Sequence, residues 1–158
     1  MALAIANQVV QDPTLKAGLK GIAAMVPATC HFDNVPDKYK SMYKSYTENA
    51  KDTPIIDGES MQIFYREVGA DPKDASLFAI LSQNLKDFPP TYLTCCEFDP
   101  LRDDAYIIQK ALEEAGVKTK LDYYEGMPHY FWIFPSVPEG QQYVGNLLAG
   151  IGWLQSQM

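Results

Sequence analysis

The chain has 158 residues, the usual size of one domain, and its 47% hydrophobic content is enough for a substantial core. The formal net charge is −7 and the isoelectric point is about 4.7, with lysine and arginine scattered along the chain. This acidity disfavours nucleic acid as a partner. From the length, we expect residues 1–158 to form a single domain. No apolar stretch reaches membrane-spanning length, so we expect no membrane partner.

The three cysteines favour reduced thiols over a disulfide or a metal site. Cys95 and Cys96 are adjacent, and neighbours on a strand point to opposite faces. Cys30 is distant from both, and the spacing fits no metal motif. The apolar N-terminus lacks the positive flank and the cleavage site of a signal peptide. We therefore expect a cytoplasmic protein that uses neither a metal nor a cofactor.

In chain order, the first two predicted elements are a helix and a strand. Residues 2–10 contain strong helix formers and run into Asp12-Pro13, which is typical of a helix end. Residues 19–28 form a short apolar run closed by Pro27, which predicts a buried strand.

Two helices are predicted in the middle of the chain. Residues 36–49 carry three tyrosines whose spacings of four and three place them on one helical face. Residues 58–69 predict a second helix, and residues 76–90 look irregular. The tyrosines and the methionines of these helices could be ordinary core, or they could line a substrate site.

The last third of the chain alternates strand and helix most clearly. The stretch TYLTCCE, residues 91–97, predicts a strand, and residues 102–116 predict a helix with one apolar stripe. Residues 117–126 predict another strand. Strand, helix and strand in this order predict a right-handed βαβ unit with parallel strands. A last amphipathic helix is predicted over residues 138–156.

Candidate site residues follow the carboxyl end of each predicted strand, where parallel sheets form their sites. Cys30 and His31 follow the first strand, Asp99 follows the second and His129 the third. A crossover of this length between adjacent strands would place Asp99 beside His129. The carboxylate would then fix the imidazole tautomer and stabilise its charged form. The alternatives are a turn or cap at Asp99, which precedes Pro100, and simple packing for His129.

The stretches around these residues resemble the α/β-hydrolase superfamily, and within it the hormone-sensitive-lipase-like esterases, most closely the fungal ones. The matching stretches lie within residues 19–135 and are PATCHFDNVPDKYKSMYKSY, PPTYLTCCEFDPLRDDA and ALEEAGVKTKLDYYEGMPHYFW. The specific signature is DPLRD followed by G-x-x-H. In such enzymes its Asp and His are the acid and base of a catalytic triad, which implies these roles for Asp99 and His129.

The same resemblance implies roles for the residues around the pair. Arg102 and Asp103 resemble the structural neighbours of the acid. Residues 33–88 resemble the lid-like excursion that covers the active site in this family. We refer to residues 33–88 as the excursion.

The chain departs from this family at the nucleophile. Neither the G-x-S-x-G elbow nor the HGGG-type oxyanion segment occurs among the 158 residues. The N-terminal helix resembles the one that directly follows the nucleophilic serine. The resemblance therefore implies a truncated α/β-hydrolase-like fold, with three parallel strands, flanking helices and the helical excursion.

A truncated sheet would leave one strand edge open. The strand near residues 20–27 is central in the family, and here it would lose one neighbour. An apolar open edge favours association, so we expect a homodimer through this edge across a two-fold axis. The alternative is pairing with another chain that supplies the missing half.

Aromatic side chains flank the candidate pair. Tyr130, Phe131 and Trp132 follow His129 directly. They could pack in the core, or they could form an apolar wall for a small apolar substrate. Residues that could complete this wall are Tyr39, Met42 and Tyr43.

The zone after the first strand offers a second kind of chemistry. Cys30 could act as a substitute nucleophile beside His31. A buried free cysteine, however, more often serves packing.

Three functions fit these residues. The favoured one is a non-hydrolytic enzyme, in which His129 is the general acid/base and Asp99 orients it. It would catalyse cyclisation, isomerisation, elimination or aldol-type closure of a small apolar carbonyl-containing secondary metabolite. The second is a carboxylic-ester hydrolase with water or Cys30 as nucleophile. The third is a non-catalytic binding or assembly subunit, or a truncated remnant.

Overall fold

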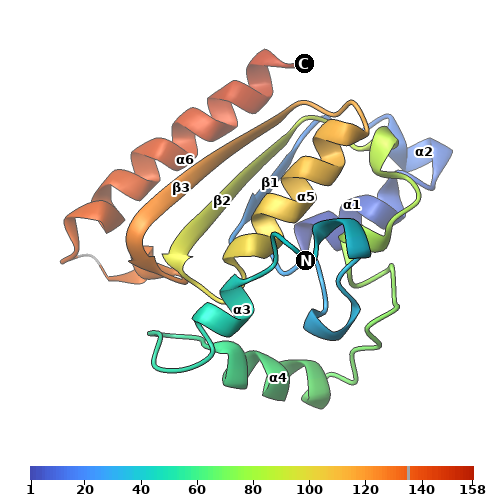
Figure 1. Ribbon diagram of the computed structural model, residues 1–158. Helices are drawn as coiled ribbons and strands as arrows, with labels where there is room; N and C mark the ends of the chain where they lie inside the picture. The colour runs from blue at the N-terminus through green and yellow to red at the C-terminus, as the bar shows by residue number, and fades with distance from the viewer. Residues whose placement is uncertain (135) are drawn as a thin grey trace.

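A parallel three-stranded sheet forms the centre of the protein, in the order β1-β2-β3. The computed structural model describes residues 1–134 and 136–158 (Figure 1). β1 spans Ile22–Met25, β2 spans Thr91–Phe98 and β3 spans Thr119–Pro128, and both pairs are parallel. The predicted α/β class is thus confirmed. Residue 135, where the resembling stretch ends, lies outside the described residues.

Helices cover both faces of this sheet. α1 (Ala2–Val9) and α5 (Arg102–Glu114) share one face, where Leu3, Leu93 and Ile107 belong to one buried cluster. Figure 1 shows α5 crossing in front of the strands. On the opposite face, Tyr143 of α6 (Pro138–Ser156) lies in a second buried cluster with residues of β2 and β3.

The two adjacent cysteines illustrate this layering. Cys95 interacts with Tyr106 of α5, while Cys96 lies in the buried cluster that Tyr143 of α6 completes. They therefore point to opposite faces, as predicted for neighbours on a strand. Both cysteines and Cys30 are free and buried.

The predicted helix over residues 36–49 is wrong. The segment forms a 3₁₀ turn at Asp37–Tyr39 and, after a break, the short helix α3 (Ser45–Glu48). The tyrosine hydroxyls donate to three separate acceptors: Tyr39 to Glu114, Tyr43 to Asp104 and Tyr46 to the Gly58 carbonyl. Their helix-like spacing therefore reflects three separate anchoring contacts and no continuous helical face.

Other observed elements also differ from their predicted bounds, and the causes are local. Asp12 does follow α1, but its carboxylate also accepts a hydrogen bond from the Thr14 amide and begins the short helix α2 (Pro13–Lys16). β1 ends before the predicted strand does, because Val26 has φ of +40° and Pro27 follows. The predicted helix at residues 58–69 is observed as α4 (Gly58–Glu67).

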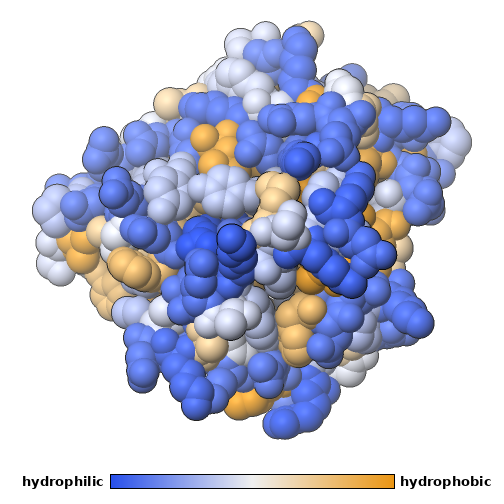
Figure 2. Space-filling model, viewed as in Figure 1, coloured by the Kyte–Doolittle hydropathy of each residue, from blue (hydrophilic) through white to orange (hydrophobic). Residues whose placement is uncertain are grey.

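The excursion runs from the carboxyl ends of the strands back to the amino end of β2, where Asp87 pairs with Lys16 of α2. It contains α3 and α4, which Figure 1 shows beneath the strand arrowheads, and two further 3₁₀ turns at Ala79–Leu81 and Leu85–Asp87. In the same view, Figure 2 shows a largely hydrophilic surface on which hydrophobic atoms form small separate patches. Among the described residues, no helix combines the length and the apolar character needed to cross a bilayer.

Candidate active site

Asp99 and His129 meet at the carboxyl ends of β2 and β3. Phe98 pairs with Pro128 in the last register position of the two strands, so Asp99 and His129 are the next residue on each. His129 Nδ1 lies 2.8 Å from Asp99 Oδ2. The predicted juxtaposition of acid and imidazole is therefore observed.

Asp99 serves as both a turn acceptor and a partner for the imidazole. Its side chain is fully buried, and Oδ1 accepts a hydrogen bond of 2.8 Å from the Leu101 amide. Its carbonyl oxygen accepts a bond of 3.1 Å from Asn49 Nδ2 of the excursion. These contacts hold Oδ2 toward His129, whose side chain is 18% exposed. The turn interpretation and the acid interpretation are thus compatible.

This arrangement can carry acid–base chemistry. A carboxylate at Nδ1 favours the tautomer with a proton on that nitrogen. Nε2 is then the nitrogen that can exchange a proton with a substrate. Because an imidazole can both accept and donate a proton, the pair can take up a proton and return it within one reaction.

The residues after Asp99 anchor the excursion to the sheet. Asp103 Oδ2 accepts hydrogen bonds of 2.6 Å from the amides of Lys44 and Ser45, the residues at which α3 begins. Arg102 bridges to Glu48 at the end of the same helix, with 2.6 Å between nitrogen and oxygen. The two residues that resemble the structural neighbours of the acid thus fix the excursion beside it.

The predicted aromatic wall divides into buried and exposed parts. Phe131 is buried, and Trp132 stacks on Tyr143 of α6 at 4.0 Å between ring centroids. Both therefore contribute to core packing. Tyr130 is 45% exposed and adopts the left-handed conformation, with φ of +59°, directly after His129. Its ring centroid lies 6.4 Å from that of His129, and a binding role for Tyr130 remains a prediction.

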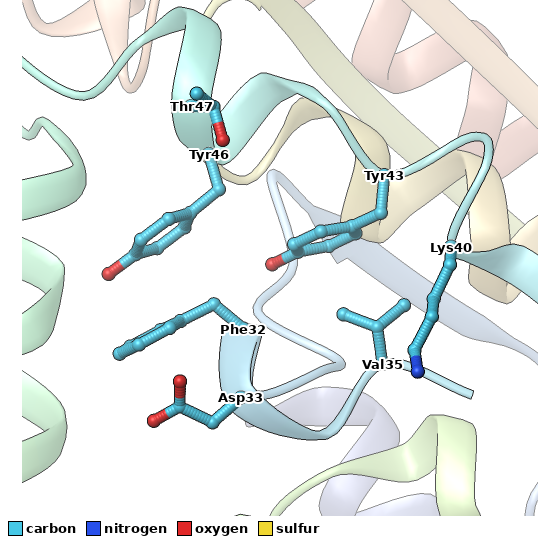
Figure 3. A pocket seen from close by; sticks show the side chains of 7 residues that line it. All are labelled: Phe32, Asp33, Val35, Lys40, Tyr43, Tyr46 and Thr47. Carbon is cyan, nitrogen blue, oxygen red and sulfur yellow. The ribbon is translucent and has the colours of Figure 1, made fainter. Parts of the chain in front are cut away.

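The predicted residues of the excursion line other hollows. Tyr43 lies in a hollow of about 330 Å³ that also includes Phe32, Lys40 and Tyr46 (Figure 3). Tyr39 borders a separate hollow of about 370 Å³. Neither hollow is lined by the residues of the acid–base pair. Met42 packs against the main core, and its sulfur lies 3.7 Å from Lys110 Nζ. A binding role for these three residues therefore remains a prediction.

Cys30 and His31 are both buried and occupied by local contacts. Burial, reinforced by the charge of Asp104, raises the pKa of the Cys30 thiol, which is the opposite of what an activated nucleophile needs. His31 Nδ1 accepts a hydrogen bond of 3.1 Å from the Asp33 amide, and its ring stacks on Phe32. Burial lowers the pKa of His31, and the nearby carboxylate of Asp33 opposes this shift. Both residues fit a packing role.

One feature of the site was not predicted. Between the Cys96–Tyr124 and Phe98–Pro128 pairs, β2 contains one residue, Glu97, whereas β3 contains three, residues 125–127. The Glu97 side chain accepts a hydrogen bond of 2.7 Å from the amide of one of them, Gly126. The available signal was the glycine of the G-x-x-H segment, which marks a bulge only when the strand pairing is known.

The sheet, the strand-end Asp–His pair and the excursion define an α/β hydrolase. Residues 1–133 match the family model described as alpha/beta hydrolase fold, and the chain belongs to this family.

The individual relatives include fungal esterases and a cyclase. The chain is 58% identical to the versiconal hemiacetal acetate esterase of Dothistroma septosporum over 100% of this chain and 48% of that protein. It is 36% identical to the versiconal hemiacetal acetate esterase of Emericella nidulans, covering 98% of this chain and 55% of the relative. Among solved structures, vibralactone cyclase superposes with a TM-score of 0.90 at 33% identity, over 98% of this chain and 46% of the cyclase. The chain thus spans about half the length of these relatives.

Proposed function

We propose that His129 is the general acid/base, oriented by Asp99, of an enzyme that acts at the carbonyl group of a small apolar metabolite. The observation that carries this proposal is the 2.8 Å contact between His129 Nδ1 and the buried Asp99 carboxylate. A packing histidine needs no fully buried carboxylate as its partner, because burying a charge has a high cost in free energy. The site needs no metal for this role.

Hydrolysis of an acetate ester is the reaction that the relatives favour. The relative with 58% identity is named for the ester versiconal hemiacetal acetate. In this reaction His129 would remove the proton from the nucleophile and then protonate the leaving oxygen. The nucleophile would be water, or a serine on a segment outside these 158 residues, since no G-x-S-x-G motif occurs within them. The buried thiol of Cys30 does not suit this role.

Non-hydrolytic proton transfer is the second candidate. The likeness to vibralactone cyclase supports it. Here His129 would move a proton to or from a carbonyl compound, as in cyclisation, isomerisation, elimination or aldol-type closure. Both candidate reactions use the same acid–base pair. They differ in the bonds that form and break at the substrate carbonyl.

Two probes separate these reactions. 4-Nitrophenyl acetate reports ester hydrolysis, and 5-nitrobenzisoxazole reports proton removal by a base without hydrolysis. We expect the purified chain to turn over at least one of them, and His129→Ala to lower that rate by about 10²- to 10⁴-fold. Hydrolysis that depends on His129 would support the esterase. Elimination without hydrolysis would support the proton-transfer enzyme.

The other histidine provides the matched control. His31→Gln should leave both rates unchanged, because the His31 ring packs against Phe32 and against Tyr65 of the excursion. Circular dichroism would verify that each variant is folded. A folded chain that turns over neither probe, or whose rate is unaffected by His129→Ala, would overturn the proposal in favour of a non-catalytic subunit.

A further inference from the structure

The contact between Asp99 and His129 depends on an irregularity in β3. From Thr91–Thr119 to Cys96–Tyr124 the two strands advance together, one residue for one residue. If that register continued, Met127 would lie opposite Asp99, and His129 would lie two positions beyond it. The extra residues of β3 remove this offset, so the two strands end with the acid beside the imidazole.

Gly126 provides the backbone conformation of this bulge. Its φ is +71°, in the left-handed region that glycine adopts at little cost. A Cβ built at Gly126 would meet no atom within 4 Å, so the restriction there is one of backbone conformation and not of space.

Glu97 holds the bulge from the neighbouring strand. Its carboxylate Oε2 accepts the amide hydrogen of Gly126 at 2.7 Å, replacing a ladder hydrogen bond that the bulge interrupts. The backbone of Glu97 is fixed in turn, since its carbonyl oxygen lies 3.4 Å from both Arg102 Nη1 and Asn49 Nδ2. The backbone of Glu97 is therefore held by α5 and the excursion, while its side chain binds the bulge.

We propose that Glu97 is a positioning residue, which sets the register that brings His129 onto Asp99 by holding the Gly126 bulge. It acts through the backbone of β3, and the inference rests on the function proposed for the pair. The proposal assigns a role to the first carboxylate of the EFDPLRD stretch, two residues before the acid.

The spectrum of the two histidines tests this role without an activity assay. His31 Nδ1 accepts a hydrogen bond, so His31 should carry its proton on Nε2, whereas His129 should carry its proton on Nδ1. In two-bond ¹H–¹⁵N correlation spectra at pH 8 the two tautomers give different patterns. We expect Glu97→Ala to lose the Nδ1–H pattern of His129 and to leave His31 unchanged. Glu97→Gln should retain it, because the amide oxygen can still accept from Gly126.

A glycine substitution provides an independent route to the same result. Gly126→Ala should also remove the Nδ1–H pattern of His129. Gly69→Ala is the matched control, because Gly69 has φ of +62° and equal space but lies outside the sheet, at the end of α4. Persistence of the His129 pattern in Glu97→Ala would overturn the proposal, whatever the result for Gly126→Ala.

Kinetics distinguish the failure of this inference from the failure of the proposed function. With the probe that the wild-type chain turns over, Glu97→Ala should lower kcat by about 10²-fold and leave KM nearly unchanged, as expected for a misplaced acid–base group. If the wild-type spectrum lacks an Nδ1–H pattern for His129, the pair itself is absent and the proposed function fails. If the wild-type pattern is present and Glu97→Ala retains it, the positioning role alone fails.

Discussion

Asp104 is the buried residue that joins three parts of the chain. Its Oδ1 accepts the amide hydrogens of Thr29 at 2.6 Å and Cys30 at 2.8 Å, and its Oδ2 accepts the hydroxyl of Tyr43 at 3.0 Å. The side chain is fully buried in α5. One carboxylate thus connects this helix to the loop after β1 and to the excursion.

This carboxylate should make stability depend on pH. Complete burial raises the pKa of Asp104 from its ordinary 3.8 to about 7, and the hydrogen bonds from Thr29 and Cys30 oppose that rise only in part. The folded state holds the Asp104 proton more tightly than the unfolded state. The contribution of Asp104 to the free energy of unfolding is therefore fully present below about pH 4. It is lost as pH rises from about 4 to about 7, at a rate on the order of 1.4 kcal/mol per pH unit.

Urea unfolding of wild-type chain and Asp104→Asn between pH 4.5 and 7 tests this. The asparagine keeps the shape and the acceptor oxygen but does not titrate, so the difference in unfolding free energy between the two should shift in favour of the variant as pH rises. The other carboxylates are present in both chains, so their pH-dependent contributions cancel in this difference. Parallel pH profiles would contradict the prediction.

The acid–base pair could be predicted from sequence, whereas this buried residue could not. Asp99 and His129 each follow a recognisable strand, and the carboxyl ends of parallel strands meet at one edge. The partners of Asp104 lie 61 to 75 positions away in a loop and in the excursion, with no periodicity to indicate them. Contacts of this kind depend on how the irregular segment folds back.

At the scale of elements, Gly150 determines how closely α6 lies on the sheet. A Cβ at this position would lie 2.3 Å from the ring of Tyr92. The ring cannot swing aside freely, because its hydroxyl donates a hydrogen bond of 2.7 Å to Asp122 on β3. The glycine therefore serves close approach between helix and strand, at the cost in helix propensity that glycine carries.

Gly150→Ala should therefore destabilise the fold by about 1–3 kcal/mol through overpacking against Tyr92. Gly152→Ala lies two residues along the same helix, where a Cβ meets nothing within 4 Å. It should stabilise the fold by about 0.5–1 kcal/mol through helix propensity. Denaturant unfolding of both variants measures the two effects. Equal effects of the same sign would show that α6 does not depend on this contact.

Elements with regular patterns were predicted well, and those governed by distant side chains were not. The predicted last helix, residues 138–156, has the observed bounds, because its signals are local. The helix expected over residues 36–49 failed because Asp103, on α5, binds the amides of Lys44 and Ser45 and starts a new helix there. The β3 bulge was missed for the same reason, since its partner Glu97 belongs to another strand.

At the scale of the whole molecule, the edge of β1 that faces away from β2 has no strand partner among the described residues. β1 pairs with β2 alone, and the inward amides of Ile22 and Val26 already bond to Pro90 and Thr94. The alternation of a parallel strand then directs the peptide groups of the intervening residues 23 and 25 outward. Met25 on this edge is 42% exposed. An edge of this kind is a template for pairing with another strand.

We propose that a second copy of the chain covers this edge, with two β1 strands antiparallel across a two-fold axis. Light scattering should then give a mass twice the 17.7 kDa of one chain. Met25→Lys places a charge on the edge and should shift the equilibrium to monomer. Ile63→Lys, on α4, is the matched control, since Ile63 is 50% exposed and the charge change is the same. A wild-type monomer at every concentration, or a dimer that withstands Met25→Lys, would contradict pairing through β1.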